Sequence, residues 1–593
     1  MPNVLCGESD SDVIEYHFQR ILWIHFFQSV REFHLDFFRQ GYFSRFNPAD
    51  ILSADTSHDR KTILGNAVLR PFFFKVDSLR FNLVYSLLTV VLYNAVFFKH
   101  AAEYQSGFLF LSCVFVCIWM TLFIAVSLLF HKHTRKPLAV TLCLLNALAF
   151  YFMFIYNAAL DKIMFLNVLQ TDVYEVRDLL SPKLILIMLF FGIFPAWLIC
   201  KTRVSPTPLK RQFAAAGGAV ALIAAIMLGN FAATDAFLRS NRNLRYYLTP
   251  SNYIGSIISV IKIKARPLPD LVKIAEDATL NRYWKNDKKN LFVFVMGETA
   301  RAANFSLRGY ERPTNAPLTP YLKDIVYYKQ TFSCGTSTAV SVPCTFSAGG
   351  QKGFVPGTEA YTENLLDVLE KVGYKVLWRE NNTGCQNVCD RVELEDPCKT
   401  GKFCLDEVML DNLAEKADSY DRDAFIVLHQ RGSHGPAYSE HYPPEAELYK
   451  PVCHQKDFPY CPQQSLVNVY DNSVYYTSMF LAKTIDLLSS LSDRYNTVLI
   501  YISDHGESLG ENGMFLHSAP YKTAPLVQKD IPFLVWMPDS FARDFQIDKA
   551  CLQQQVDKPH SQDNIFHSVL GLSGIKTGLY NPELDIFARC RRK

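Results

Sequence analysis

The first half of the chain alternates between long apolar stretches and short polar connections. Five apolar stretches occupy 81–98, 108–130, 138–156, 184–200 and 213–231. Their lengths are close to the roughly 20 residues that a bilayer core requires. Apolar stretches of this length predict transmembrane helices. We therefore expect a five-helix transmembrane domain over residues 76–232.

The connections between these stretches predict their orientation. Basic residues cluster at 70–80, at 131–136 and at 201–211, which lie on one face of the membrane if five spans are correct. An excess of Lys and Arg marks the cytoplasmic face. An odd number of crossings then places everything after about Ala232 on the other side, which is the periplasm in a Gram-negative bacterium.

The second half of the chain has the pattern of an α/β domain. Continuous apolar runs at 291–296 and 498–503 predict central strands of a parallel sheet that is covered on both faces. Further strands are expected at 374–378, 423–428 and 533–537, and helices at 363–371 and 465–491. We assign 286–593 to this soluble domain and 233–285 to a juxtamembrane bridging helix and linker, with the proline-containing linker at 265–270.

Candidate metal ligands follow the two central strands directly. Glu298 comes after the first strand, and Asp504 and His505 come after the second. Because ligands of parallel sheets bind at the carboxyl ends of the strands, these side chains are expected to converge. Two carboxylates and one imidazole with an open fourth position suit a catalytic zinc ion, so the sequence predicts an enzyme.

A nucleophile can be sought among hydroxyl groups, because a metal ion lowers the pKa of a coordinated hydroxyl. The segment 334–344, CGTSTAVSVPC, offers several serines and threonines before an expected helix whose N-terminal amides would favour a phosphate. A run rich in serine and threonine is more commonly a loop or a helix cap. The segment alone does not identify a catalytic residue.

Four longer motifs carry a specific resemblance. The strings GETARAANFSLRGYERPTNAPL from Gly297, CGTSTAVSVPC from Cys334, HQRGSHGPAY from His429 and SDHGESLGENGMFLH from Ser503 occur in this order. They resemble the lipid A phosphoethanolamine transferases, zinc enzymes of the alkaline phosphatase and sulfatase superfamily that are related to the mobile colistin resistance enzymes. The resemblance covers roughly 75–590 and implies an α-helical transmembrane bundle of five spans followed by an α/β, sulfatase-like soluble domain.

The resemblance also implies roles for individual residues. It places the nucleophile at Thr338, which would complete a zinc-binding set with Glu298, Asp504 and His505. Asp504 has a second interpretation as a general base, but a direct metal ligand is the simpler role.

Other positions of the motifs imply contacts with the transferred phosphate. His434 and His517 match residues associated with substrate phosphate or a second zinc ion, and Asn382 matches a polar substrate contact. We interpret His429 as a packed group beside the site. Gln386 stands where a lysine is expected in several relatives, so electrostatic assistance to the phosphate would be weaker or would come from another group.

Two segments near the membrane are candidate lipid-facing surfaces. Arg242 and Arg245 lie among tyrosines just after the last span, where aromatic rings sit at headgroup depth and guanidinium groups meet phosphates. An interfacial anchor without substrate contact explains the same pattern. The long connection 161–183, with Asn167 and Gln170, resembles an amphipathic loop that lies near the active site in the family.

The cysteines support an extracytoplasmic second half. Ten of the fifteen follow residue 330, and eight form the close pairs 334/344, 385/389, 398/404 and 453/461. Such pairs predict disulfides in an oxidising compartment. Structural zinc knuckles are the alternative, but the regular two-residue spacing is absent. Residues 551 and 590 form a candidate fifth bridge, whereas the membrane-half cysteines 113, 117, 143 and 200 are expected to be small apolar side chains.

The charge and the N-terminus add little to the functional picture. A formal net charge of +3 gives no reason to expect nucleic acid as a partner. Residues 1–75 lack the apolar core and cleavage site of a signal peptide. They are expected either to form amphipathic helices on the membrane or to follow an unused upstream start, and we assign them no function.

The sequence thus predicts a multi-pass enzyme of the bacterial inner membrane whose catalytic domain lies in the periplasm. The expected reaction moves phosphoethanolamine from phosphatidylethanolamine to lipid A or lipopolysaccharide through a phosphothreonine. The first alternative is the same chemistry on a core sugar (Kdo or heptose), another surface glycan or another headgroup, as in a phosphoglycerol transferase or hydrolase. The second is a catalytically silent membrane sensor, which the intact set of candidate ligands disfavours.

Overall fold

The computed structural model describes residues 74–104, 107–171, 176–177, 179–264, 270–398 and 404–592. All of them belong to one compact unit, Phe73–Lys593. The N-terminal extension, apart from its last two residues, and the expected linker at 265–270, apart from Asp270, lie outside the described residues.

Four of the expected spans are confirmed as long apolar helices. They are α4 (Phe108–Leu129), α5 (Arg135–Tyr156), the continuous run of α8 (Pro182–Ile187), η2 (Met188–Ile193) and α9 (Phe194–Lys201), and α10 (Leu209–Gly229). The third of these contains a turn of π-helix over η2. Each is long enough to cross the apolar core of a bilayer.

The first expected span is not straight. It comprises α2 (Ser78–Tyr93) and α3 (Ala95–Tyr104), which meet at an angle of 65°. The bend is at Asn94, whose amide nitrogen donates to the carbonyl oxygens of Thr89 and Thr249. Its amide oxygen accepts from the backbone N–H of Thr249. The apolar residues predicted this span from the sequence. The bend could not be predicted, because it depends on hydrogen bonds between Asn94 and Thr249, which is 155 positions away.

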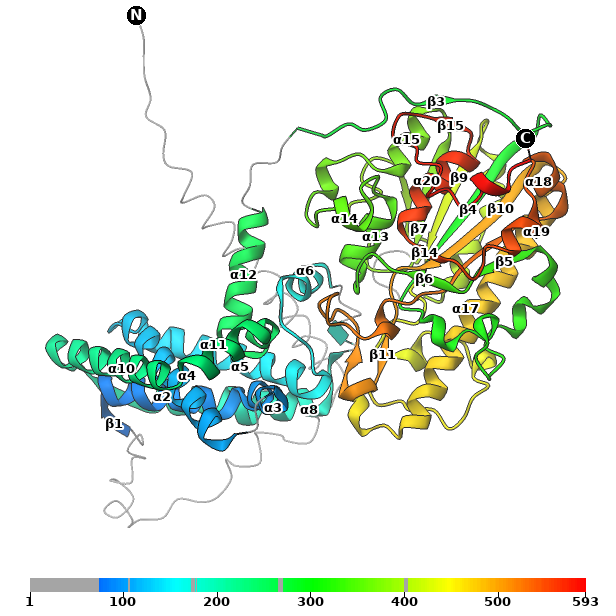
Figure 1. The fold of residues 1–593 in the computed structure, drawn as a ribbon. Helices are drawn as coiled ribbons and strands as arrows, with labels where there is room; N and C mark the ends of the chain where they lie inside the picture. Colours follow the sequence, from blue (N-terminus) through cyan, green and yellow to red (C-terminus); the bar gives the residue numbers. More distant parts are fainter. Residues whose placement is uncertain are drawn as a thin grey trace, which may run out of the picture. The chain divides into compact units, whose positions relative to one another are not determined.

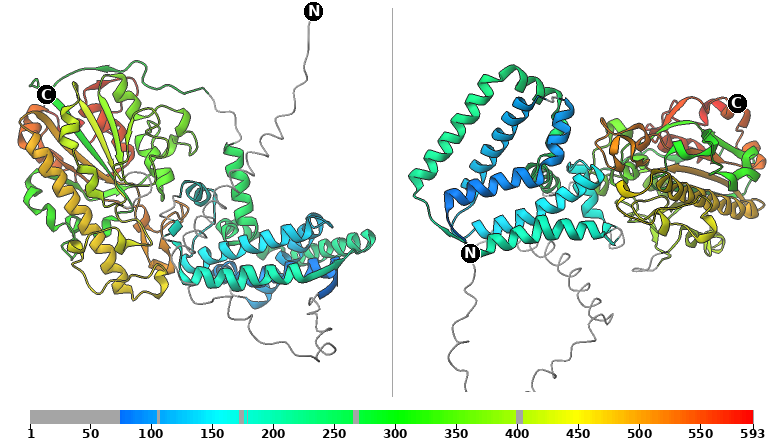
Figure 2. Two further views of the ribbon diagram at one scale, coloured as in Figure 1. Left: turned by 180° about the vertical axis from the view of Figure 1, so that it is seen from behind. Right: turned by 90° about the horizontal axis from the view of Figure 1, so that it is seen from below.

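The helices of the membrane half pack around small interior clusters. Helix α4 contacts α2 and α10, and α5 contacts η2, α9 and α2 (Figure 2). One cluster joins Phe81, Phe130, Phe150 and Ile199 from four different helices or their ends. Helix α10 leaves most of its apolar side chains exposed, as a helix that borders lipid does.

Three helical segments connect the membrane half to the catalytic domain. They are α11 (Phe231–Ser240), η3 (Arg242–Tyr247) and α12 (Ser251–Lys264). Helix α12 packs against η3 and against α6 (Lys162–Gln170), which belongs to the connection between α5 and α8. The carboxylate of Asp161 caps α6 by accepting from the N–H groups of Ile163 and Met164.

A seven-stranded sheet forms the centre of the catalytic domain (Figure 1). In order across the sheet, its strands are β5 (Ile325–Tyr328), β13 (Phe533–Trp536), β10 (Tyr495–Ser503), β4 (Lys289–Gly297), β9 (Ala424–His429), β7 (Lys375–Glu380) and β8 (Glu393–Glu395). Neighbouring strands from β10 to β8 are parallel. Strand β13 runs antiparallel to both of its neighbours, β10 and β5, so β5 has the same direction as β10. All five strands expected from the sequence are present.

Helices cover both faces of this sheet, which explains the continuous apolar strands. Phe292, Phe294 and Met296 of β4 face the layer of α13 (Thr338–Phe346), α15 (Leu365–Lys371) and α20 (Asp563–Leu572). The intervening side chains face the 29-residue helix α17 (Gln463–Leu491) on the other side (Figure 1). Helices α15 and α17 confirm the two expected helices.

Shorter elements complete the domain. The short helices are α14 (Gly350–Gly353), α16 (Leu413–Asp418), α18 (Asp539–Asp544) and α19 (Lys549–Gln553). Its two-stranded sheets are β3 (Thr279–Leu280) with β15 (Ile575–Lys576), β6 (Gln330–Phe332) with β14 (Pro559–Ser561), and β11 (Ser508–Leu509) with β12 (Phe515–Leu516). A further two-stranded sheet, β1 (Phe74–Asp77) with β2 (Thr202–Ser205), lies in the membrane half. The hairpin of β11 and β12 follows the metal-ligand motif directly.

Five disulfides join the cysteine pairs that the sequence suggested, including the candidate fifth. They are Cys334–Cys344, Cys385–Cys389, Cys398–Cys404, Cys453–Cys461 and Cys551–Cys590. In the described part of the chain, the free cysteines are those of the membrane half, at 113, 117, 143 and 200.

Candidate active site

The candidate ligands meet at the carboxyl edge of the parallel strands. Gly297 at the end of β4 pairs with Ser503 at the end of β10, so Glu298 and Asp504 emerge side by side. His429 ends β9 between them and Glu380 of β7. The aligned strand ends therefore bring together side chains that are about two hundred residues apart in sequence.

Backbone contacts fix Glu298 at this edge. Thr299 adopts a left-handed conformation (φ 58°), and its hydroxyl donates to Glu298 Oε1 over 2.6 Å. Gly432 approaches the backbone so closely that a Cβ there would lie 2.8 Å from the carbonyl oxygen of Glu298. Because Gly432 also has a φ of 53°, only glycine fits this position without strain.

Asp504 and His505 each use one polar side-chain atom in hydrogen bonds to the backbone and keep the other for the candidate metal site. Asp504 Oδ1 accepts from the N–H of Thr299 and from that of His505, whereas the buried Oδ2 has no hydrogen-bond partner. Nδ1 of His505 lies 2.9 Å from the carbonyl oxygen of Gly506 and donates to it. In the neutral ring the lone pair of His505 is therefore on Nε2, where a metal ion can bind once the ring has lost its second proton.

The four candidate ligand atoms have the spacing of a tetrahedral site. The hydroxyl of Thr338 lies 3.2 Å from each carboxylate oxygen of Glu298 and 3.3 Å from Nε2 of His505. Nε2 in turn lies 3.4 Å from Glu298 Oε1 and 3.0 Å from Asp504 Oδ2. Ligands about 2.0 Å from a central zinc ion in a regular tetrahedron are about 3.3 Å apart. These residues fit Zn²⁺ in number, type and spacing.

The electrostatics of the site favour a bound cation. Burial and the nearby Asp504 carboxylate raise the pKa of Glu298. Burial alone would lower the pKa of His505, but Asp504 and Glu298 outweigh it and raise the pKa of the imidazole to about 9. Concentrated carboxylates of this kind favour a positive charge at their centre.

Thr338 is the first residue of helix α13, which packs with α15 and α20 on one face of the central sheet. Ser337 precedes it in extended conformation. The hydroxyl of Ser341 accepts from the N–H of Gly335, and the Cys334–Cys344 disulfide links the start of the loop to the helix. Thr338 is half-buried, so its hydroxyl remains accessible at a helix N-terminus that favours phosphate.

Asn382 lies directly beside the candidate metal ligands. Its amide nitrogen donates to Glu298 Oε2 over 2.8 Å and to the carbonyl oxygen of Gln430 over 2.8 Å. Nε2 of His429 lies 3.1 Å from the same nitrogen, and its Nδ1 lies 3.1 Å from Glu380. The structure thus places His429 as a fully buried group behind Asn382.

His434 and His517 lie together next to His505. The ring centroids of His505 and His517 are 4.4 Å apart, and those of His434 and His517 are 5.4 Å apart. Burial and the neighbouring cationic groups hold the pKa of His434 well below its usual range, so its ring is neutral at pH 7. A neutral ring can donate to a phosphate oxygen or bind a metal ion.

Sequence reasoning missed Glu507, which adjoins these rings. Its side chain is fully buried, and one carboxylate oxygen lies 3.5 Å from Nδ1 of His517. Its position two residues after His505, within the motif SDHGES, is the signal that could have indicated it. This separation is an ion-pair distance, and within the described residues neither carboxylate oxygen of Glu507 forms a hydrogen bond.

The candidate lipid-facing residues divide into two groups. Asn167 of α6 donates to Ser518 over 2.7 Å, and its buried Oδ1 has no hydrogen-bond partner, so it faces the catalytic domain one residue from His517. Gln170 ends α6, but its side chain lies outside the described residues. Arg242 and Arg245 are exposed, and Arg245 contacts the ring and the hydroxyl of Tyr246. The structure does not bring these arginines to the metal ligands.

Gln386 is buried within the loop that the Cys385–Cys389 disulfide closes. Its Oε1 has no hydrogen-bond partner, and its Nε2 contacts the carbonyl oxygen of Gly384 over 3.4 Å. At position 386, where the resemblance leads us to expect a lysine, the chain therefore has a neutral amide.

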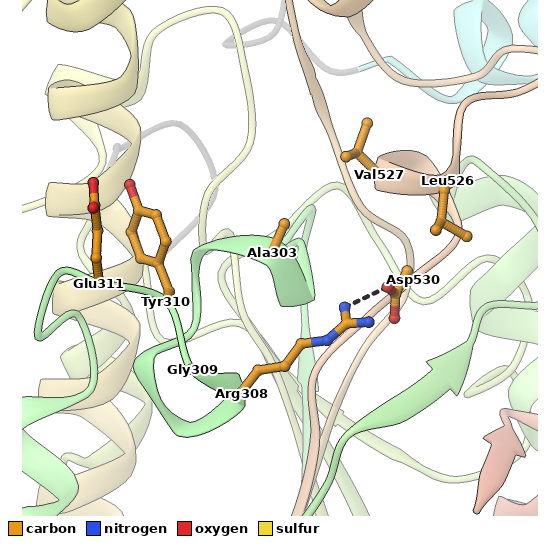
Figure 3. A pocket seen from close by; sticks show the side chains of 8 residues that line it. All are labelled: Ala303, Arg308, Gly309, Tyr310, Glu311, Leu526, Val527 and Asp530. Atoms are coloured by element: carbon orange, nitrogen blue, oxygen red, sulfur yellow. Dashed lines mark hydrogen bonds and ion pairs between the residues drawn. The ribbon is translucent and has the colours of Figure 1, made fainter. Parts of the chain in front are cut away.

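The catalytic domain also contains a pocket of about 580 Å³ (Figure 3). Ala303, Arg308, Gly309, Tyr310, Glu311, Leu526, Val527 and Asp530 line it. Arg308 forms an ion pair with Asp530 across this pocket (Figure 3). None of the expected site residues lines it, so we place the chemistry at the strand ends.

Comparisons with known proteins identify the family of the chain. A family model described as sulfatase matches residues 290–575, and one described as phosphoethanolamine transferase EptA/EptB matches residues 118–265. The chain is 38% identical over 476 residues to the phosphoethanolamine transferase EptA of Escherichia coli K12, which covers 77% of this chain and 86% of that relative. It is 34% identical over 467 residues to the phosphatidylethanolamine transferase Mcr-2 of Escherichia coli. This match covers 75% of this chain and 87% of that relative.

A solved structure matches most of the chain. The integral membrane protein lipooligosaccharide phosphoethanolamine transferase A (EptA) from Neisseria meningitidis superimposes with a TM-score of 0.84 at 32% identity. The match covers 88% of this chain and 100% of that one. These findings confirm the expected family and the expected combination of membrane helices with a sulfatase-like domain. The chain belongs to the phosphoethanolamine transferase family and is an integral membrane enzyme of that class.

Proposed function

We propose that the protein transfers phosphoethanolamine from phosphatidylethanolamine to a phosphate group of lipid A, with Thr338 as the covalent carrier. One observation carries the proposal. The Thr338 hydroxyl, at the start of a helix, completes a tetrahedral set with Glu298, Asp504 and His505. This set would hold Zn²⁺. Bound there, the ion would lower the pKa of the hydroxyl and offset negative charge on the transferred phosphate.

In the first half-reaction, Thr338 Oγ1 forms a bond to the phosphorus of phosphatidylethanolamine. The bond from phosphorus to the diacylglycerol oxygen breaks. The Thr338 hydroxyl loses one proton, and the departing diacylglycerol oxygen gains one. The product is a phosphodiester of Thr338 and ethanolamine. The N-terminal amides of α13 favour the negative charge of this group.

In the second half-reaction, an oxygen of a lipid A phosphate attacks the same phosphorus. The bond to Thr338 breaks, the threonine hydroxyl is restored, and the product carries ethanolamine through a pyrophosphate. His434 and His517 would bind the non-bridging oxygens or a second zinc ion. Asn382 would contact the phosphate while holding Glu298 in place.

Both substrates are lipids, so the site must face the bilayer. Asn167, whose Oδ1 lacks a hydrogen-bond partner, supports a substrate contact on α6, and we propose Gln170, also in α6, as a second contact. Arg242 and Arg245 would bind lipid headgroups from the bridging segment η3. The positive-inside pattern and the disulfides support a periplasmic catalytic domain on the inner membrane. We propose the domain boundaries 76–232, 233–285 and 286–593, after an N-terminal extension 1–75.

The acceptor is the part of this proposal with a competing candidate. A core sugar such as Kdo or heptose would use the same carrier and the same metal site. Mass spectrometry of lipid A, from cells with active protein and from cells with Thr338→Ala, separates the two. Phosphoethanolamine on lipid A supports our proposal, and its appearance on the core oligosaccharide instead overturns the choice of acceptor.

The donor headgroup can be tested in the same cells. A phosphoglycerol transferase would leave glycerol phosphate on the acceptor, and a hydrolase would leave the acceptor unmodified. The mass of the product therefore identifies the donor directly. A product mass that corresponds to glycerol phosphate would identify phosphatidylglycerol as the donor and would exclude phosphoethanolamine transfer.

A further inference from the structure

A disulfide-closed loop of the catalytic domain contacts the membrane half at a second place, apart from the contact between α6 and α13. We call residues 453–461, which the Cys453–Cys461 bridge closes, the docking loop. Helix α5 contacts its short helical turn η11 (Phe458–Tyr460). The loop contains none of the metal ligands or proposed phosphate contacts, so the mechanism above does not account for it.

The polar contacts of the docking loop cross between the two halves. The hydroxyl of Tyr151 in α5 donates to Asp457 Oδ1 over 3.1 Å, and the ammonium of Lys183 lies 3.8 Å from Asp457 Oδ2. The hydroxyl of Tyr156 donates to the carbonyl oxygen of Lys456 over 3.2 Å. Lys183 also lies over the ring of Tyr460. Within the described residues, both polar partners of the Asp457 carboxylate belong to the membrane half.

Burial shows that the two surfaces are matched. Asp457 is only 5% exposed although it lies on a surface loop of its own domain. Tyr151 is fully buried, and its hydroxyl also lies 2.9 Å from that of Ser181. A buried carboxylate requires partners, because unpaired burial is strongly unfavourable. The membrane half supplies both a hydroxyl and a cation for it.

Apolar contacts extend the same interface toward the active site. Phe515 and Leu516 of β12 pack against a cluster that contains Tyr151 and Tyr156. Leu516 is adjacent to His517 in sequence. Phe458 of the docking loop stacks on Tyr438 with ring centroids 5.1 Å apart. The interface is therefore continuous with the wall of the histidine cluster.

We propose that the docking loop holds the active site at the depth of the lipid headgroups, and that Asp457 and Tyr151 are positioning residues for a donor embedded in the bilayer. The inference rests on the proposed function, because it concerns access of Thr338 to a lipid phosphodiester. The disulfide restricts the loop to conformations close to the docked one and so reduces the entropy lost on docking. Neither residue takes part in bond making or breaking.

Two donors with the same phosphodiester distinguish this role from a general structural one. Purified, zinc-loaded full-length protein is reconstituted in liposomes and given either phosphatidylethanolamine in the bilayer or water-soluble glycerophosphoethanolamine. Tyr151→Phe removes only the hydroxyl, and Asp457→Ala removes the carboxylate. We expect each to reduce turnover of the bilayer donor about tenfold, the size expected for loss of a hydrogen bond to a charged group, and to leave turnover of the soluble donor unchanged within about twofold.

The matched disulfide controls sharpen the result. Replacing Cys453 and Cys461 together by serine is expected to reproduce the selective loss. Replacing Cys551 and Cys590, which bridge a different part of the domain, is expected to affect the two donors equally. Equal loss of both donors in Tyr151→Phe and Asp457→Ala, or no loss of either, overturns the positioning role.

Hydrogen exchange tests docking without reference to activity. Amides of the docking loop are expected to exchange faster in Tyr151→Phe than in the parent protein, while those of β4 are unchanged. Unaltered exchange in the loop contradicts the docking itself. If the parent protein transfers neither donor but the loop responds as expected, the proposed reaction fails and the docking contact stands.

Discussion

The hydroxyl of Thr338 lies 3.2 Å from both carboxylate oxygens of Glu298. Thr338 begins helix α13, Glu298 directly follows strand β4, and 40 positions separate the two residues in sequence. With a metal ion among Glu298, Asp504 and His505, this relationship would make the threonine a ligand and a nucleophile at once, as we propose. The predictions below depend on it.

Replacing Thr338 tests whether its hydroxyl is the nucleophile. Thr338→Ala is expected to reduce transfer at least about a thousandfold, because loss of a nucleophile removes the covalent route. Thr338→Ser keeps the hydroxyl and is expected to retain measurable activity. Thr523→Ala, at an exposed threonine, is the matched control. Activity of Thr338→Ala within about tenfold of the parent would exclude the role.

Removing the metal ion is expected to abolish transfer reversibly. Dialysis against a chelator should eliminate activity, and Zn²⁺ should restore it. Glu298→Ala and Asp504→Asn should remain folded and membrane-inserted, because both residues directly follow strand ends and belong to neither apolar core layer, but they should lose activity and bound zinc. Elemental analysis and circular dichroism measure these effects. Full activity in protein without metal would refute the site.

Zinc uptake should release protons at neutral pH. The pKa of His505 is raised to about 9 in the metal-free site, so its ring is protonated at pH 7.5, whereas a metal ligand must be neutral. The apparent zinc affinity should therefore fall as the pH decreases below about 9, by up to about tenfold per unit for each proton released. Titration calorimetry in buffers of different ionisation enthalpy measures the protons, and a value of zero contradicts the prediction.

The Cys334–Cys344 bridge is expected to matter more for activity than Cys551–Cys590. It closes a loop that carries the nucleophile, and a bridge of this kind contributes roughly 2–4 kcal/mol by restricting the unfolded chain. Paired serine substitutions should therefore lower transfer more at 334 and 344 than at 551 and 590. Thiol labelling reports whether Cys334 is free in the native protein, and a free thiol there would refute the bridge.

Modification of lipid A should protect cells from polymyxins. Phosphoethanolamine adds an ammonium group beside a phosphate and weakens electrostatic attraction of cationic peptides to the surface. Cells with active protein should show a higher minimum inhibitory concentration than cells with Thr338→Ala at equal expression. Equal values despite measurable transferase activity would indicate an acceptor other than a lipid A phosphate.

The sequence predicted the elements whose pattern is local. β4 and β10 were identifiable because helices cover both faces of the sheet and every residue of their cores is apolar. The bend at Asn94 was not, because a hydrogen-bond partner far along the chain produces it. The edge strand β5 has the residue types of a strand but is only 4 residues long, and it was not predicted.

The same distinction applies to the site. Glu298, Asp504 and His505 were predictable because each directly follows a recognisable strand, and strand ends meet at one edge. The contact of Asn167 with Ser518 and the docking of Asp457 on Tyr151 depend on how the two halves pack. Sequence spacing carries no information about such contacts.

The most direct test of the account is mass spectrometry of the carrier residue. The zinc-loaded protein is incubated with phosphatidylethanolamine in the absence of acceptor, quenched in acid and digested, and the peptide that contains Thr338 is sequenced. We predict one phosphoethanolamine group on Thr338, absent from Thr338→Ala and removed when lipid A is added. A protein that transfers the group to lipid A while Thr338 remains unmodified, or while another residue carries the adduct, would contradict the account.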